Sequence, residues 1–177
     1  GSIGKAYGYQ LGVRHQYKEG MMDQVDRVLY DLKNNPYSRR IMTNIYVHQD
    51  LHEMNLYPCA YSMTFNVTGN KLNAILNQRS NDILTANNWN VVQYAVLVHM
   101  IAQVSGLEAG ELVHVIADAH IYDRHIPLVK ELIKRQTYDA PVFHMNPDVK
   151  DFYEFTVDDF ELEDYKYGPQ IKIPVAV

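Results

Sequence analysis

The segment Tyr61-Ser62-Met63-Thr64-Phe65-Asn66-Val67 alternates large apolar side chains with polar ones. This two-residue period is that of a strand with one buried face. Gly69-Asn70 comes next and is typical of a tight hairpin turn. The alternation then resumes at Leu72 and continues to Gln78. The pattern predicts a β-hairpin over residues 61–78.

Helices are predicted on both sides of the hairpin. Residues 22–33 place apolar side chains on one face at helical spacing, and Pro36 follows the end of this helix. Residues 90–104 are apolar on nearly all sides, which predicts a buried helix that Gly106 ends. Further strands are expected over 41–47 and 112–119, and a helix over 126–135. The chain is therefore of the α+β class, with hairpin-linked strands packed on helices.

The composition, 47% hydrophobic and 21% charged, is that of a globular protein, and 177 residues fit one domain. A net charge of -5 argues against a large nonspecific nucleic-acid surface. No apolar run approaches the ~20 residues of a membrane span. The single cysteine, Cys59, cannot form a disulfide within the chain, which favours a cytoplasmic location. No set of Cys and His has zinc spacing, so we expect no metal.

Cys59 stands directly before the hairpin, and Arg79 stands directly after it. Because the two strands pair, these residues can lie close together. A nearby guanidinium stabilises a thiolate over a thiol, which would prepare Cys59 as a nucleophile. Two alternatives remain open at this point: a cysteine that only fills space, and an Arg79 that pairs with Asp82 at the surface.

Two further segments suit a nucleotide. Arg39 and Arg40 precede a predicted strand, and adjacent guanidiniums offer planar forks of donors to a phosphate. A solvated charge pair at a strand edge is equally compatible with them. Asn90 begins the apolar helix and is a good N-cap, yet its amide also matches the carbonyl and N–H of a uracil edge.

Asp118, His120 and Tyr122 end the last predicted strand of this region. A two-residue period places the three side chains on one face. They can hold a sugar hydroxyl there, or form a hydrogen-bonded cluster with a purely structural role.

Taken in order, these segments resemble the pattern of the thymidylate synthase family. The resemblance runs essentially from end to end, and so many motifs in register are not explained by chance. Its carriers are Ile3-Gly4-Lys5-Ala6-Tyr7-Gly8, Ser38-Arg39-Arg40, Pro58-Cys59, Gln78-Arg79-Ser80-Asn81-Asp82, Asn90, Asp118-Ala119-His120-Ile121-Tyr122 and Pro174-Val175-Ala176-Val177.

The resemblance implies the fold of that family, a mixed and mostly antiparallel sheet packed by helices, with a homodimer formed through the sheet. It also implies reductive methylation of dUMP to dTMP, with 5,10-methylenetetrahydrofolate as the cosubstrate and no metal. The intermediate would be a covalent bond between Cys59 and C6 of the uracil ring. The expected partners are dUMP, folate and a second copy of the chain, with no membrane and no obligate nucleic acid.

The resemblance also assigns roles to residues. Arg79 would bind phosphate and help to activate Cys59. Arg39 and Arg40 would complete the site of the other subunit. The remaining nucleotide contacts would come from Gln78, Ser80, Asn81, Asp82, Asn90, His120 and Tyr122. The folate would contact Asp82 and the C-terminal Ala176, whose segment would close over the ligands.

Some positions depart from the family pattern. Members of the family begin well before Gly1, so we expect a single domain over residues 1–177 that lacks the family's N-terminal segment. Ala60 stands where many members have His, Trp89 where Phe is usual, and Ile116-Ala117 where a glycine-containing pair is usual. Two alternatives stay open: a pyrimidine nucleotide hydroxymethylase of the same family, and a noncatalytic fragment that binds nucleotide.

Overall fold

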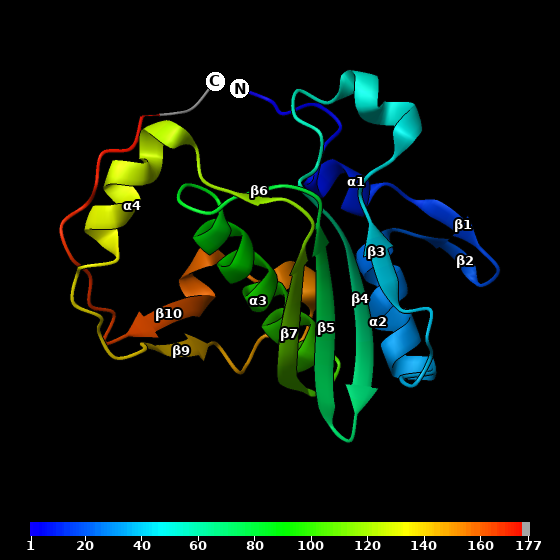
Figure 1. Cartoon of the computed structure of the whole chain (residues 1–177). Coiled ribbons are helices and arrows are strands. Elements are labelled where there is room, and N and C mark those ends of the chain that lie inside the picture. The colour runs from blue at the N-terminus through cyan, green and yellow to red at the C-terminus, as the bar shows by residue number, and fades with distance from the viewer. Residues whose placement is uncertain (175–177) are drawn as a thin grey trace.

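A four-stranded sheet forms the centre of the computed structural model, which describes residues 1–174 (Figure 1). The strands lie in the order β3 (Met42–Asn44), β4 (Ala60–Thr68), β5 (Lys71–Gln78) and β7 (Glu108–Ile116). The pairs β3–β4 and β4–β5 are antiparallel, whereas β5–β7 is parallel. The predicted hairpin is therefore confirmed, and so is the mixed, mostly antiparallel sheet of an α+β fold.

Two helices cover the inward face of this sheet. They are α2 (Gln24–Asn34) and α3 (Asn87–Val104), and α3 is also part of the connection between the parallel strands β5 and β7. Asp23 caps α2, because its side chain accepts a hydrogen bond from the backbone N–H of Asp26. One core joins the three elements: Val28, Leu32, Met63, Phe65, Leu72, Leu76, Val98 and Ile101.

The helix α3 is less buried than the prediction said, and it begins three residues earlier. Its buried residues Tyr94, Val98, Ile101 and Ala102 follow one helical stripe. A single sheet face covers only such a stripe, so Trp89 remains 78% exposed. The N-cap position belongs to Ala86 and not to Asn90, whose backbone N–H already donates to the Ala86 carbonyl. The expectation of an N-cap at Asn90 was therefore wrong.

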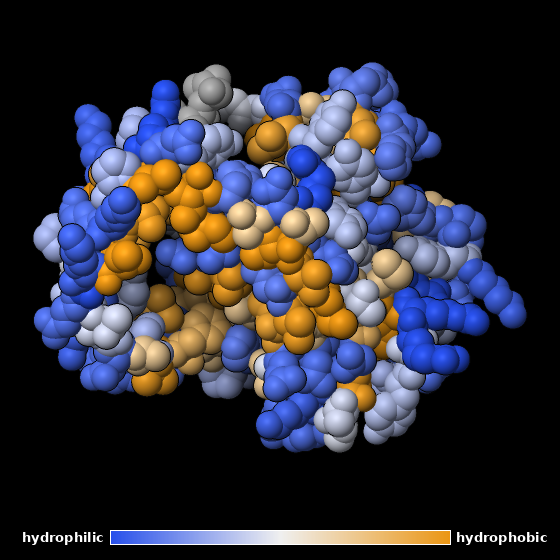
Figure 2. All heavy atoms as spheres, in the orientation of Figure 1, coloured by the Kyte–Doolittle hydropathy of each residue, from blue (hydrophilic) through white to orange (hydrophobic). Residues whose placement is uncertain are grey.

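The outward face of the sheet carries a mixed set of side chains. Met42, Thr64, Ile75 and Val113 lie in one row across the four strands, as the strand register shows. Val113 and Val115 are each 48% exposed. Figure 2 shows an apolar area at the centre of this side of the molecule. None of the described helices is long and apolar enough to cross a membrane.

The C-terminal part lies beside α3. Its aromatic side chains pack together, with ring centroids of Phe143 and Phe160 6.3 Å apart and those of His99 and Phe143 5.0 Å apart. Gln103 of α3 donates to the carbonyls of Asn146 and Val149. These contacts fasten the strand pair β9 (Val142–Met145) and β10 (Phe160–Glu163) to the helix.

The remaining elements are short. The predicted helix near residue 126 is α4 (Ile126–Leu132), which ends three residues before the expected limit. The others are α1 (Gly8–Gly12), β1 (His15–Tyr17), β2 (Gly20–Met22), η1 (His48–Glu53), β6 (Asn81–Asp82), β8 (Ala119–His120), η2 (Asp123–His125), η3 (Phe152–Glu154) and η4 (Val157–Asp159).

Candidate active site

Cys59 and Arg79 lie side by side at the end of the hairpin. The backbone N–H of Arg79 donates to the Cys59 carbonyl at 2.8 Å. The Tyr57 carbonyl oxygen accepts a hydrogen bond from Nη2 of Arg79 at 3.0 Å and lies 4.0 Å from the Cys59 sulfur. Nε of Arg79 donates to the Pro58 carbonyl. Two backbone carbonyls next to the cysteine thus hold the guanidinium in place. Arg79 does not pair with Asp82, which was the alternative left open by the sequence.

Tyr7 is a neighbour of the cysteine that sequence reasoning missed. Its hydroxyl oxygen accepts a hydrogen bond from the backbone N–H of Cys59 at 3.0 Å. Burial raises the pKa of Tyr7. The backbone of Tyr7 has a φ of 48°, a conformation that costs free energy outside glycine. The hydrogen bond joins residues 52 positions apart, a distance over which no local pattern operates.

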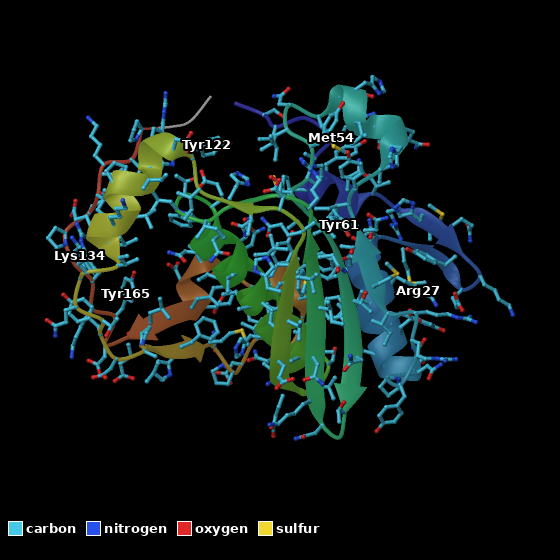
Figure 3. The ribbon with its side chains drawn as sticks, in the orientation of Figure 1. Arg27, Met54, Tyr61, Tyr122, Lys134 and Tyr165 are labelled. Atoms are coloured by element: carbon cyan, nitrogen blue, oxygen red, sulfur yellow. The ribbon has the colours of Figure 1, made fainter. Side chains whose placement is uncertain are left out.

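Arg79 also lines a pocket of 410 Å³ on the outward side of the sheet. Its other lining residues are Asn44, Tyr46, His48 and Tyr61. Figure 3 labels Tyr61 beside the central sheet and Tyr122 beside α4. Within residues 1–174, Nη1 of Arg79 has no hydrogen-bond partner, so the guanidinium keeps donors for an anion.

Gln78 connects the hairpin to α3. Its side chain is only 2% exposed. Nε2 donates to the Ser80 carbonyl at 2.8 Å and to Oδ1 of Asn90 at 3.0 Å. Oε1 lies 2.8 Å from Nε2 of His114, a residue of β7 that the sequence reasoning did not single out. Asn90 is therefore held in place by a buried amide, one turn inside the helix.

The strands β5 and β7 continue into the short parallel pair β6 and β8. Asn81 pairs with Ala119 there, and Asp82 pairs with His120. Segments 78–82 and 118–120 are thereby brought together, as their assignment to one site requires. Asn81 is 1% exposed, and its Oδ1 has no partner among the described residues.

Asp82 stabilises the turn that leads into α3. Its carboxylate accepts hydrogen bonds from the backbone N–H groups of Leu84 and Thr85 and from the Thr85 hydroxyl. Burial acts to raise the pKa of Asp82, but these hydrogen bonds outweigh it and lower the pKa. The carboxylate is therefore held ionised at the edge of the site.

Asp118, His120 and Tyr122 form the cluster that their spacing suggested. Nδ1 of His120 lies 3.0 Å from Oδ1 of Asp118, and its ring meets that of Tyr122 edge-on at 5.2 Å. The ring of Tyr122 also meets that of His125 edge-on, and His125 is a buried residue whose Nε2 lies 2.8 Å from the Pro174 carbonyl. Ala176, the expected folate contact near the chain end, lies outside the described residues.

Arg39 and Arg40 lie away from Cys59. They are exposed in the turn before β3, at the end of the sheet opposite to the cysteine. The Ile41 carbonyl faces Phe65, six positions along β4 from Cys59. At about 3.3 Å per residue the separation is roughly 20 Å. Within one chain the structure does not bring these arginines into the site.

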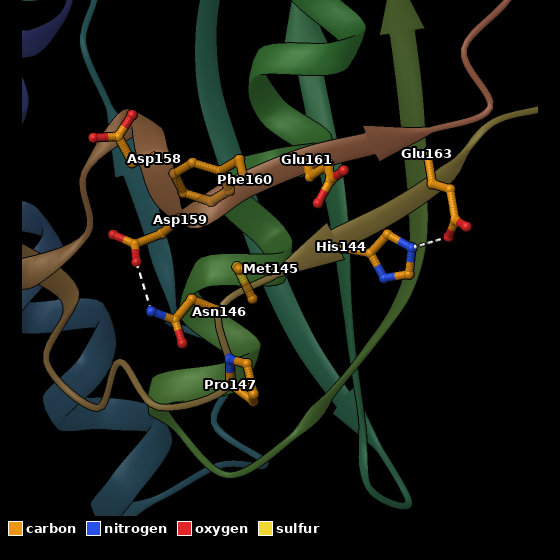
Figure 4. Close-up of a pocket in the computed structure, with 9 residues that line it drawn as sticks. All are labelled: His144, Met145, Asn146, Pro147, Asp158, Asp159, Phe160, Glu161 and Glu163. Atoms are coloured by element: carbon orange, nitrogen blue, oxygen red, sulfur yellow. Dashed lines mark hydrogen bonds and ion pairs between the residues drawn. The ribbon is translucent and has the colours of Figure 1, made fainter.

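Larger hollows lie elsewhere. One of 580 Å³ lies against the strand pair β9 and β10 and is lined by acidic residues, His144 and Phe160 (Figure 4). Two polar contacts lie within its lining, His144 with Glu163 and Asn146 with Asp159. Another, of 720 Å³, lies against α2. A third, of 520 Å³, is lined by residues of 132–138 and 168–169. No predicted site residue lines any of them. Residues 1–174 contain no group of three or more His, Cys, Asp or Glu placed to hold a metal ion.

Known proteins share this arrangement. The family model described as thymidylate synthase matches residues 1–177. A thymidylate synthase of Bacillus licheniformis is 48% identical over 178 aligned positions, and so is that of Bacillus phage phi3T. The alignments cover 100% of this chain and 64% of each relative.

A solved structure gives the same result. The thermostable thymidylate synthase A of Bacillus subtilis superposes with a TM-score of 0.94 at 46% identity, again over 100% of this chain and 64% of that one. The chain thus spans about two thirds of the length of these relatives. The chain therefore belongs to the thymidylate synthase family.

Proposed function

We propose that the chain carries the nucleophile and the nucleotide site of a thymidylate synthase, which methylates dUMP to dTMP with 5,10-methylenetetrahydrofolate. The observation that carries the proposal is the position of Cys59, the sole cysteine, beside the anchored guanidinium of Arg79. That pair lies where segments 78–82 and 118–120 meet. A nucleophile, a phosphate ligand and a base-reading amide therefore share one end of the sheet.

Covalent catalysis explains why a cysteine is needed. The Cys59 thiolate adds to C6 of the uracil ring, and saturation of the C5–C6 bond makes C5 nucleophilic. C5 then forms a bond to the one-carbon unit of the cosubstrate and loses its proton. Cleavage of the carbon–nitrogen bond releases tetrahydrofolate, which returns a hydride to the exocyclic methylene. The Cys59–C6 bond breaks, leaving dTMP and dihydrofolate. Because the thiol must stay reduced, we also propose a cytoplasmic location.

The polar residues of the site suit the parts of the nucleotide. Arg79 offers Nη1 to the phosphate from the rim of the 410 Å³ pocket. Asn90 offers an acceptor and a donor to the uracil edge. His120 and Tyr122 reach the deoxyribose hydroxyl, and Gln78, Ser80 and Asn81 line the nucleotide. Asp82 borders the nucleotide and the folate. We keep Ala176 as a proposed folate contact.

A homodimer accounts for Arg39 and Arg40. The outward face of the sheet exposes Met42, Val113 and Val115, an apolar surface that a second copy would bury. In a two-fold arrangement the same patch contacts itself, so opposite ends of the two sheets can meet. Such packing places the arginines of one chain near the Cys59 end of the other, where each site would gain two more cations for the phosphate.

The test is an intact-mass spectrum after mixing the protein with 5-fluoro-dUMP and methylenetetrahydrofolate. Fluorine at C5 cannot leave as the proton does, so the expected result is a mass increase equal to both ligands, located on Cys59 by peptide mapping. Cys59→Ser is the matched control and should show no adduct. Absence of the adduct on the unaltered protein would count against the proposal. With dUMP itself, release of a hydroxymethyl product in place of dTMP would identify the related hydroxymethylase.

A further inference from the structure

The side chain of Gln78 makes three hydrogen bonds whose directions can be worked out. The Ser80 carbonyl can only accept, so the Gln78 atom that faces it at 2.8 Å is the amide nitrogen. The amide oxygen must then face His114, at 2.8 Å. An amide oxygen is an acceptor only, so Nε2 of His114 carries the proton in this contact. One backbone carbonyl thus determines the tautomer of a histidine on a different strand.

The same logic extends to Asn90. The second hydrogen of the Gln78 amide nitrogen points to Asn90 at 3.0 Å, so the Asn90 atom there is the oxygen. Its amide nitrogen and the second lone pair of its oxygen are left for a ligand. The chain of donors therefore runs in one direction, from His114 through Gln78 to Asn90.

A fixed amide direction has a consequence for base choice. The edge of uracil presents N3–H as a donor and O4 as an acceptor, whereas cytosine presents N3 as an acceptor and its amino group as a donor. To bind cytosine, the amide of Asn90 would have to exchange its oxygen and nitrogen. That exchange would turn the Asn90 nitrogen toward the Gln78 nitrogen and leave two donors facing each other in a buried place.

We infer that His114 is a positioning residue that selects uracil over cytosine nucleotides, by holding Gln78 in the orientation that fixes the amide of Asn90. This inference rests on the proposed function, because it takes the ligand of Asn90 to be a pyrimidine nucleotide. Burial lowers the pKa of His114. The lowered pKa favours the neutral ring at neutral pH, and a neutral ring carries its proton on one nitrogen only. Gln78 is nearly inaccessible to water, so water does not replace the histidine donor easily.

The test compares dissociation constants of dUMP and dCMP for the unaltered protein, His114→Met and His114→Gln. Met keeps volume but has no N–H donor, whereas Gln keeps a donor. We expect His114→Met to reduce the preference for dUMP by about fivefold, the change that one net hydrogen bond supports. His114→Gln should keep most of the preference. An unchanged preference in His114→Met, or an equal loss in both variants, would overturn the inference.

A second measurement determines the tautomer in the unaltered protein, and a variant serves only to assign the His114 signals. Long-range ¹H–¹⁵N correlation spectra distinguish a protonated ring nitrogen from an unprotonated one, and His114→Gln identifies the His114 signals by their loss. The inference requires a protonated Nε2 and an unprotonated Nδ1, and the opposite tautomer would overturn it. If the protein binds neither nucleotide, the proposed function fails, while the tautomer still decides whether the Gln78 network is as described.

Discussion

The inward face of the hairpin changes character along its length. In the middle of β4 and β5, Phe65 and Leu76 are buried in an apolar core. At the end near Cys59, the equally buried Gln78 is surrounded by polar partners from three other segments. An apolar core tolerates the exchange of one apolar side chain for another of similar volume, whereas each buried polar group needs a hydrogen-bond partner in a particular position. The same two strands therefore provide a stable scaffold at one end, and at the other end a site that depends on particular polar contacts.

The largest expected effect is at the polar end. Cys59→Ser should lower turnover by at least about 10³-fold, because a hydroxyl is a far weaker nucleophile than a thiolate at neutral pH. The free energy of unfolding should change by less than about 1 kcal/mol, since the change replaces one atom. Steady-state kinetics and urea denaturation check the two halves. A large loss of stability would show that the cysteine also supports the scaffold.

The apolar end should respond in the opposite way. Phe65→Ala should reduce the free energy of unfolding by about 3–5 kcal/mol, through lost burial and the cavity left behind. Phe65→Leu is the control and should cost clearly less. Nucleotide affinity, measured at a temperature where the variant is folded, should stay close to that of the unaltered protein. A loss of nucleotide affinity in the folded variant would show that the apolar end also determines binding, and would contradict the difference between the two ends.

A smaller effect is expected at Asn90. An ionised Asp accepts but cannot donate, so Asn90→Asp should weaken dUMP more than dCMP, changing the ratio of their affinities by about tenfold. Titration calorimetry with both nucleotides measures this ratio. If it stays unchanged, Asn90 does not read the base, and the polar end owes its specificity to other groups.

The apolar end was predictable from sequence, because alternation of side chains is a local signal. The hairpin and its turn formed as expected around Gly69, which adopts a φ of 62°. The position of Arg79 beside Cys59 also followed from strand pairing. The exposed face of α3 did not follow, since the four-stranded sheet and the strand pair β9–β10 together still leave one side of this apolar helix uncovered. Trp89 shows this most clearly.

The polar end was only partly predictable. Motif resemblance pointed to Gln78, Asn90 and His120, but not to His114 as a partner of Gln78 or to Tyr7 as a partner of Cys59. His114 contacts Gln78 across 36 positions, and Tyr7 contacts Cys59 across 52. Such contacts depend on how strands are ordered, and the parallel pairing of β5 with β7 was not apparent from the chain. A histidine between Val113 and Val115, in a strand that is otherwise apolar there, was the one available signal for His114.

The parallel pairing of β5 and β7 has a consequence for the order of folding. An antiparallel hairpin closes a short loop, whereas strands joined through α3 pair only after a long loop has closed, at a greater entropic cost. Gln78 arrives with the first event, and His114 arrives with the second. A refolding molecule therefore contains the cysteine and its neighbouring arginine early, whereas the contact on which the proposed choice of pyrimidine depends forms only late.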